Sequence, residues 1–81
     1  MSEQQTIVYG TTWCGQTRRA RACLEACGVP YRWVDIDQDA EGRRYVEQVN
    51  RGFRSVPTIV FPDGSILVEP TEAQLRSKLG R

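Results

Sequence analysis

The feature that most constrains the fold is a strand-like segment followed by a helical segment and then by a second strand-like segment. Residues 6–9 are β-branched or aromatic and end at Gly10, which is typical of a buried strand. From Gln16 on, four apolar positions recur at the spacing of one helix face: Ala20, Cys23, Leu24 and Cys27. Residues 31–37 then alternate like a second strand. Because a helix connects them, the two strands are expected to lie parallel, joined by a right-handed crossover.

The rest of the chain predicts a helix, a hairpin and a final helix. We expect these elements at residues 41–49, 56–61, 65–68 and from Thr71 onward. The two strands are joined through Pro62-Asp63-Gly64-Ser65, which indicates an antiparallel hairpin. Gln74, three residues after Thr71, completes the pattern of a capping box. The order β-α-β-α-β-β-α therefore predicts an α/β fold, with a four-stranded mixed sheet flanked by three helices on its two faces.

Length, charge and hydropathy patterning describe a small soluble protein. With 81 residues the chain has room for one core, so residues 1–81 are expected to form a single domain. No apolar run is long enough to span a membrane, and the polar start is unlike a signal peptide. A net charge of +1 disfavours a dedicated nucleic-acid binder. We therefore expect a cytoplasmic monomer with neither a membrane nor a nucleic acid as its partner.

The cysteine and histidine counts narrow the chemistry. Three cysteines are an odd number, which excludes a complete internal disulfide framework. Without a secretory signal the thiols are expected to be reduced, and each is then catalytic, metal-binding or simply buried. The chain has no histidine, which excludes a Cys–His protease and a Cys/His zinc site. Three cysteines cannot supply four thiolate ligands either, so we expect no metal site.

Cys14 lies in the turn directly before the first helix, where a thiol becomes reactive. Free backbone N–H groups and the helix dipole stabilise a thiolate at this end of a helix. Three arginines crowd the same stretch: Arg18, Arg19 and Arg21. Positive charge near a helix N-terminus opposes the dipole, and a costly feature beside a thiol hints at function. The alternatives are an inert buried cysteine and arginines that are merely solvated, although a Trp-Cys-Gly turn is a poor place to bury a thiol.

Cys23 and Cys27 are predicted to play a different part. Both lie on the apolar face of the first helix, where a thiol packs like a small hydrophobic group. Cys14 and Cys23 are separated by about 13 Å along a standard helix, beyond the reach of a disulfide. Core packing is therefore expected for Cys23 and Cys27, and a redox role would need the helix to unwind or a second molecule to supply a partner.

Three segments then carry a resemblance to a known family: Tyr9–Thr17, Arg54–Thr58 and Asp63–Gly64. In this order and at these distances they resemble the glutaredoxins of the thioredoxin superfamily. More narrowly, the segments Thr11–Gly15, Val49–Thr58 and Asp63–Ser65 are similar to the actinobacterial mycoredoxins. The resemblance covers essentially the whole chain, and it implies a thioredoxin-like fold with a redox-active cysteine in the motif Cys-Gly-Gln-Thr.

The resemblance also implies roles for individual positions. Cys14 would be the nucleophile that attacks a mixed disulfide. The positions that would support it are Trp13, Gly15, Gln16, Thr17, Arg18 and Arg21, with Arg18 or Arg21 lowering the pKa of the thiol. Pro57 would be a cis-proline facing Cys14, leaving the backbone of Val56 free to pair with a small thiol cofactor like an added strand. The remaining positions of this groove would be Ser55, Gly64, Glu69, Pro70 and Thr71, and a helix N-terminus there suits an anionic group.

Two departures from the family pattern bear on mechanism. The usual second cysteine is Thr17 here, which cannot form a disulfide, so a monothiol route through Cys14 is expected. A natural threonine and an engineered trapping variant fit the sequence equally well. Many glutathione-using members also carry a lysine before the active-site loop and acidic residues after a Gly-Gly. Here Thr11 begins the loop and Ser65-Ile66 follow Gly64, which favours mycothiol over glutathione as the low-molecular-weight thiol.

The expected function is therefore a thiol–disulfide oxidoreductase in cell redox homeostasis and electron transport. It would reduce mixed disulfides between proteins and a low-molecular-weight thiol. The alternative is a monothiol protein that binds a [2Fe–2S] cluster between two subunits, although Gln16 and Thr17 depart from the Cys-Gly-Phe-Ser motif usual there. A dedicated electron donor to a reductase is disfavoured because it needs both active-site cysteines, and a redox-inactive interaction module is the remaining possibility.

Overall fold

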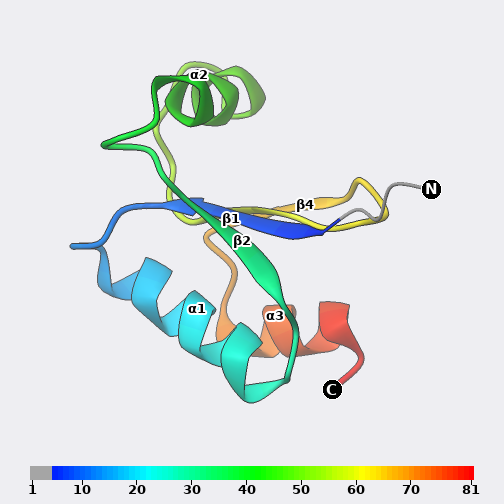
Figure 1. Cartoon of the computed structure of the whole chain (residues 1–81). Coiled ribbons are helices and arrows are strands. Elements are labelled where there is room, and N and C mark those ends of the chain that lie inside the picture. Colours follow the sequence, from blue (N-terminus) through cyan, green and yellow to red (C-terminus); the bar gives the residue numbers. More distant parts are fainter. Residues whose placement is uncertain (1–4) are drawn as a thin grey trace.

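A four-stranded sheet lies at the centre of the computed structural model, which describes residues 5–81 (Figure 1). The strands are β1 (Thr6–Gly10), β2 (Tyr31–Asp35), β3 (Thr58–Val60) and β4 (Ile66–Val68). Their spatial order is β2-β1-β3-β4. β1 pairs in parallel with β2 and antiparallel with β3, and β3 pairs antiparallel with β4. The predicted mixed sheet, including its C-terminal hairpin, is confirmed.

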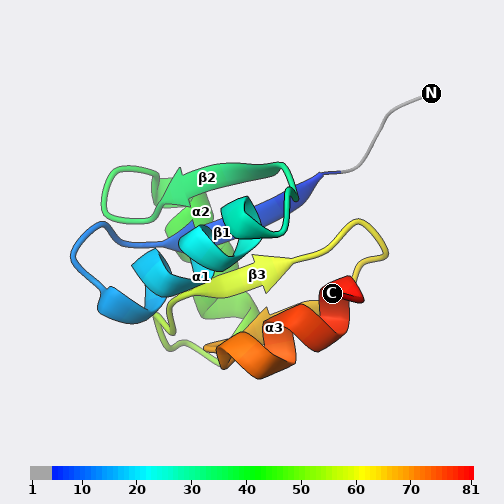
Figure 2. The same cartoon turned by 90° about the horizontal axis from the view of Figure 1, so that it is seen from below.

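Three helices cover the two faces of this sheet. They are α1 (Gly15–Ala26), α2 (Ala40–Val49) and α3 (Glu72–Leu79). α1 and α3 lie next to each other on one face, and α2 lies alone on the other (Figures 1 and 2). Within residues 5–81, no helix is long and apolar enough to cross a membrane. The order of elements and the α/β class agree with the sequence pattern.

The end of β2 differs from the prediction, because the strand stops at Asp35 rather than running to residue 37. The Asp35 carboxylate accepts a hydrogen bond from the backbone N–H of Asp37 at 2.9 Å, which turns the chain. Asp39 then caps α2, its carboxylate accepting from the backbone N–H of Gly42 at 2.9 Å. Short acidic side chains that bond nearby N–H groups compete with strand pairing, which accounts for the early end.

The segment before β3 also differs from the prediction. β3 begins at Thr58, whereas a strand from residue 56 was expected. The Val56–Pro57 peptide bond is cis, as the resemblance implied. The hydroxyl of Thr58 donates to the carbonyl of Ser55 at 2.8 Å, which closes the turn around this bond. Val56 and Pro57 therefore lead into the strand without pairing in it.

The core lies between the sheet and the pair α1 and α3. The buried residues that form it are Val8, Ala20, Cys23, Leu24, Ile59, Phe61 and Leu75. Cys23 is 6% exposed, and Cys27 packs against this cluster while remaining half-buried. The predicted capping box fixes the start of α3: the Thr71 hydroxyl accepts from the Gln74 N–H, and the Gln74 amide oxygen accepts from the Thr71 N–H. α3 is thus held beside α1 from a defined starting point.

Candidate active site

Cys14 occupies the position directly before the first turn of α1. Its backbone is extended, with φ −82° and ψ 119°, and its carbonyl accepts a hydrogen bond from the Arg18 N–H at 3.1 Å. The side chain is half-buried, so the sulfur is held by its surroundings and still reaches solvent. No acidic residue lies in the first turn of α1 to oppose a thiolate there.

The pKa of the Cys14 thiol lies below its ordinary value. Burial raises this pKa, and the carboxylate of Glu69 raises it further. Hydrogen bonds from the side chain and backbone of Thr17 and from the backbone of Gln16 outweigh both effects. Because these donors favour the charged sulfur, the first turn of α1 prepares Cys14 as a nucleophile.

Thr17, which stands where the family has its second cysteine, is fully buried against the end of β1. A Cβ added to Gly10 would come within 2.5 Å of the Thr17 methyl carbon and 2.8 Å of its hydroxyl oxygen. Apart from the Cys14 sulfur, the hydroxyl has no hydrogen-bond partner within residues 5–81. The sequence showed Gly10 only as the end of a strand, and its role as the contact surface for Thr17 was missed.

Arg18 and Arg21 of α1 form hydrogen bonds with groups other than the Cys14 thiol. Arg18 donates to the carbonyl of Thr12 at 3.1 Å, and Arg21 donates to the Tyr31 hydroxyl at 3.0 Å. The guanidinium of Arg21 also lies 4.0 Å from the centre of the Trp33 ring, in a cation–π contact on β2. Neither arginine is among the main groups that shift the pKa of Cys14. The prediction that Arg18 or Arg21 lowers this pKa is corrected: hydrogen bonds at the helix start lower it.

Trp13 stands beside the thiol as an exposed aromatic side chain. It is 69% exposed, yet its indole N–H donates to the Asp37 carboxylate at 2.9 Å. This bond ties the active-site turn to the turn that follows β2. The indole is thereby held in place while most of the side chain stays open to solvent.

The segment before α3 comes close to the start of α1. The Gln16 amide donates to the carbonyl of Glu69 at 3.1 Å, and the Glu69 N–H donates to the carbonyl of Pro57 at 2.8 Å. The cis-proline, Glu69 and the first turn of α1 are therefore joined by hydrogen bonds. Within residues 5–81, the backbone N–H and C=O of Val56 take no backbone hydrogen bond. These groups form the part of the predicted groove that the structure brings together.

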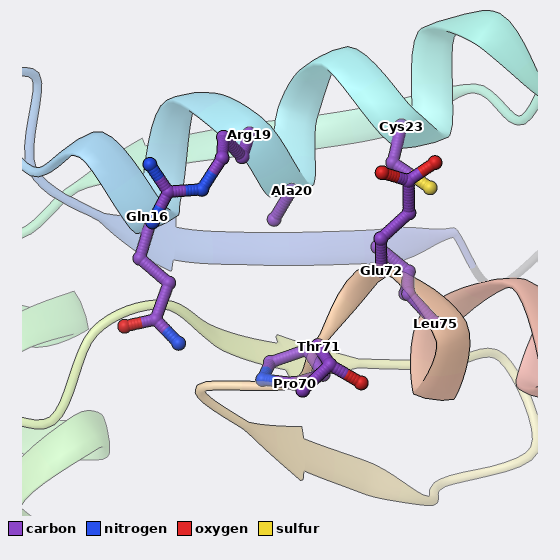
Figure 3. Close-up of a pocket in the computed structure, with 8 residues that line it drawn as sticks. All are labelled: Gln16, Arg19, Ala20, Cys23, Pro70, Thr71, Glu72 and Leu75. Carbon is purple, nitrogen blue, oxygen red and sulfur yellow. The ribbon is translucent and has the colours of Figure 1, made fainter.

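A cavity of about 370 Å³ opens beside this junction, between α1 and α3 (Figure 3). Its lining residues are Gln16, Arg19, Ala20, Cys23, Pro70, Thr71, Glu72 and Leu75. Gln16 and Arg19 come from α1, whereas Pro70 and Thr71 come from the start of α3, as the close-up shows. Pro70 and Thr71 thus lie at a concave surface next to the active-site helix, as a groove for a small ligand requires.

Gly64 lies elsewhere, which corrects its predicted place in the groove. It belongs to the turn between β3 and β4, with φ 88° and its N–H donating to the Phe61 carbonyl at 2.8 Å. Asp63 in this turn pairs with Lys78 at 2.8 Å, at the C-terminal end of α3. Thr71 caps the opposite end of that helix. The turn that contains Gly64 is therefore tied to the C-terminal end of α3, whereas the groove lies at its N-terminal end.

The residues that the structure describes contain no group of three or more potential metal ligands among His, Cys, Asp and Glu. The groups that stabilise the Cys14 sulfur are the hydroxyl and backbone N–H of Thr17 and the backbone N–H of Gln16. Such an arrangement can carry out nucleophilic attack on a disulfide sulfur.

Comparison with known proteins identifies a family model and relatives that are similar to this chain. Residues 6–66 match the family model described as Glutaredoxin. A protein of Mycobacterium tuberculosis named as a glutaredoxin is 39% identical over 72 residues, covering 89% of this chain and 86% of that protein. Mycoredoxin 1 of Corynebacterium glutamicum is 36% identical over 72 residues, covering 89% of each chain.

A solved structure agrees with these relatives. The glutaredoxin from Methanosarcina mazei Go1 superposes with a TM-score of 0.76 at 28% identity, covering 98% of this chain and 81% of that one. The similarity therefore includes the sheet, the three helices and the turn that carries Cys14.

Proposed function

Because the chain belongs to the glutaredoxin family, we propose that it reduces mixed disulfides between proteins and a low-molecular-weight thiol, with Cys14 as its only catalytic thiol. The observation that carries this proposal is the position of Cys14 before α1, where hydrogen bonds from Gln16 and Thr17 lower its pKa. A thiolate is the form that attacks a disulfide, so this position supplies the nucleophile.

The reaction has two exchange steps. The Cys14 thiolate attacks the small-thiol sulfur of a protein–S–S–R disulfide, and the protein thiolate leaves and takes up a proton. Cys14 is then held in a disulfide with the small thiol. A second molecule of that thiol attacks the outer sulfur, forms R–S–S–R and returns Cys14 to its thiolate. For each protein thiol that is restored, one R–SH from solution is consumed and one R–S–S–R is formed.

Thr17 favours this monothiol route over an internal one. A threonine cannot attack the Cys14 mixed disulfide, so the second step needs a thiol from solution. Its hydroxyl, which has no other partner within residues 5–81, donates to the Cys14 thiolate and stabilises it both as the attacking group and as the leaving group.

The small thiol is proposed to lie between Val56 and the start of α3. The unpaired backbone N–H and C=O of Val56 suit the cysteine-like part of the thiol, in the manner of an added strand. The N-terminus of α3, capped by Thr71, suits an anionic or polar end. We infer mycothiol rather than glutathione from the mycoredoxin resemblance and from the absence of a lysine before the active-site loop. A reduced thiol that cycles in this way fits the cytoplasm, and the protein is proposed to act there as a monomer.

The experiment that tests the proposal uses a Cys23→Ala/Cys27→Ala variant, in which Cys14 is the only thiol. This variant is incubated separately with mycothiol disulfide and with glutathione disulfide, and its intact mass is measured before and after addition of the matching free thiol. We expect one adduct, formed faster with mycothiol disulfide and removed by mycothiol.

The matched control is Cys14→Ser in the same background, which should take no adduct. Failure of Cys14 to react with either disulfide would overturn the oxidoreductase proposal. Anaerobic reconstitution with iron and sulfide in the presence of each small thiol would then test the [2Fe–2S] alternative, for which a visible absorption band and a dimer are required.

A further inference from the structure

The C-terminal end of α1 carries two thiols that the proposed reaction does not use. Cys23 is almost fully buried, whereas Cys27, one turn later, is half-buried and reaches solvent. The two side chains are four residues apart on one face of the helix, and the neighbouring Cys27 thiol contributes to raising the pKa of Cys23, after burial. Two neighbouring thiols of unequal exposure form a pair in which one can react with a molecule in solution and the other can react with the first.

A cationic group from another helix contacts this pair. Arg76 of α3 donates from Nη1 to the Cys27 sulfur at 3.5 Å, and its Nε donates to the Glu72 carboxylate at 2.9 Å. A thiol that served only as a small apolar side chain would need no such neighbour. Arg76 therefore places a positive charge at the sulfur of the more exposed of the two thiols.

The surface around the pair admits a small molecule. A cavity of about 230 Å³ lies between α1 and α3, lined by Arg19, Ala22, Cys23, Ala26, Glu72 and Arg76. Cys27 is not among these lining residues, but the Arg76 side chain that borders the cavity donates to the Cys27 sulfur. The cavity beside the active site also extends to Cys23 (Figure 3). Arg19 and Arg76 give this surface two positive charges against the single carboxylate of Glu72, which favours a ligand that bears carboxylates.

The position at the helix end makes a bridge between the two sulfurs feasible. Within a regular helix, side chains at i and i+4 have Cβ atoms roughly 5–6 Å apart, whereas a disulfide needs about 3.8 Å. Cys27 is the C-cap of α1, and Gly28 follows it in the left-handed region at φ 70°. The Cys27 N–H still donates to the Cys23 carbonyl at 3.0 Å, so a bridge requires the last turn of α1 to open. Since the helix ends here, this opening leaves the start of α1 untouched.

From this geometry we propose that Cys23 and Cys27 are a second redox couple, which closes to a disulfide within α1 by reacting with a low-molecular-weight disulfide. Cys27 as thiolate attacks one sulfur of R–S–S–R, forming Cys27–S–S–R and releasing one thiolate, which takes up a proton. Cys23 loses its proton and attacks the Cys27 sulfur, which releases the second R–SH. The two protein thiols are oxidised to one disulfide, and R–S–S–R is reduced to two R–SH.

This couple works independently of the active site. About 13 Å of helix separates Cys14 from Cys23, so neither partner exchanges directly with Cys14. The chain would thereby hold a two-electron dithiol store that its active site, with Thr17 as the fourth residue of the motif, lacks. Mixed-disulfide reduction at Cys14 and oxidation of the pair can each occur without the other.

The test uses Cys14→Ser, which lacks the proposed catalytic thiol, with glutathione disulfide as the probe. We expect the protein mass to fall by two hydrogen atoms, both thiols to become inaccessible to alkylation, and the protein to stay monomeric on a non-reducing gel. Trypsin releases both cysteines in the single peptide 22–32, so the bridge is identified directly in that peptide. Two thiols that remain free, or a bridge found only between two chains, would overturn the proposal.

Two further variants separate the roles of the thiols. In Cys14→Ser/Cys23→Ala the glutathione adduct should persist on Cys27, because no partner displaces it. In Cys14→Ser/Cys27→Ala no adduct should form, because Cys23 is buried. An adduct on Cys23 in that variant would contradict the assigned order of attack.

Arg76 provides a matched measurement on the attacking step. Arg76→Gln in the Cys14→Ser background should slow adduct formation by about tenfold, the effect of losing one hydrogen bond to a charged group. Circular dichroism checks that α3 is retained. An unchanged rate would remove Arg76 from the proposal. Because every protein in this series lacks Cys14, failure here leaves the function proposed for Cys14 intact.

Discussion

The two ends of α1 hold thiols of opposite character. At the N-terminal end, hydrogen bonds from Thr17 and Gln16 outweigh burial and lower the pKa of Cys14. Near the C-terminal end, burial raises the pKa of Cys23 above its ordinary value, and Arg76 only partly opposes it. A helix offers free N–H donors at its start and free carbonyls at its end. The position of a cysteine along the helix therefore decides what can stabilise its thiolate. At the start of the helix the backbone N–H groups do so, whereas near its end a side chain from another element is needed.

The largest expected difference is between variants that lack one thiol, at either the N-terminal or the C-terminal end of α1. Cys14→Ser should lower turnover of a protein–small-thiol mixed disulfide by roughly a thousandfold or more, because the nucleophile is lost. Cys27→Ser should leave turnover within about twofold of the parent protein, because it lies at the other end of α1. The rate of protein-thiol release with an excess of the small thiol measures both variants. Equal losses in the two variants would remove the distinction between the two ends.

A smaller effect is expected from substituting Thr17, which tests how much its hydroxyl stabilises the Cys14 thiolate at the N-terminal end of α1. Thr17→Val keeps the shape that packs on Gly10 and removes the hydroxyl, so the pKa of Cys14 should rise. Since the thiolate is populated above the pKa, the alkylation rate rises with pH, and its midpoint should move to higher pH. At neutral pH the variant should react about tenfold more slowly.

The pH dependence of iodoacetamide alkylation, followed in the Cys23→Ala/Cys27→Ala background, measures this change. Thr17→Ser retains the hydroxyl and is the matched control, expected to keep a midpoint near that of the parent protein. A midpoint unchanged in Thr17→Val would show that the backbone N–H groups alone stabilise the thiolate.

The smallest effect is expected from α3, which lies against both ends of α1. Thr71→Ala breaks the capping box and should lower the free energy of unfolding by about 1 kcal/mol. Thr71→Ser keeps the capping oxygen, so its free energy of unfolding should fall by only a few tenths of a kcal/mol. Urea unfolding followed by tryptophan fluorescence compares the variants. A loss in Thr71→Ser as large as in Thr71→Ala would assign the effect to the methyl group rather than to the cap.

Local patterns in the sequence predicted much of the fold. The spacing of Ala20, Cys23 and Leu24 predicted α1, and Thr71 with Gln74 predicted the cap of α3; the structure contains both. These signals are short in range, because helix faces and caps are formed by residues three or four positions apart. The position of Cys14 before α1 was predicted on the same basis.

Contacts between segments that are distant in the sequence were harder to predict. Arg21 lies near Cys14 in sequence, yet its guanidinium stacks on Trp33 of β2, because the helix rotates it toward the sheet. Gly64 belongs to a recognisable turn, but only the packing of that turn against Lys78 shows that it lies at the far end of α3. Both errors have one cause. The spacing of residues predicts which face of a helix or turn they occupy, but it does not predict which distant segment packs against that face.

The contact between Thr17 and Gly10 bears on how readily this protein could change its chemistry. Within residues 5–81 the Thr17 hydroxyl has no hydrogen-bond partner other than the Cys14 sulfur, and its methyl group lies against a residue without a side chain. A cysteine at this position would be of similar size and would lose only the bond from the hydroxyl to the Cys14 sulfur. One substitution therefore separates the protein from a two-thiol active site, and the architecture around position 17 raises little barrier to that step in either direction.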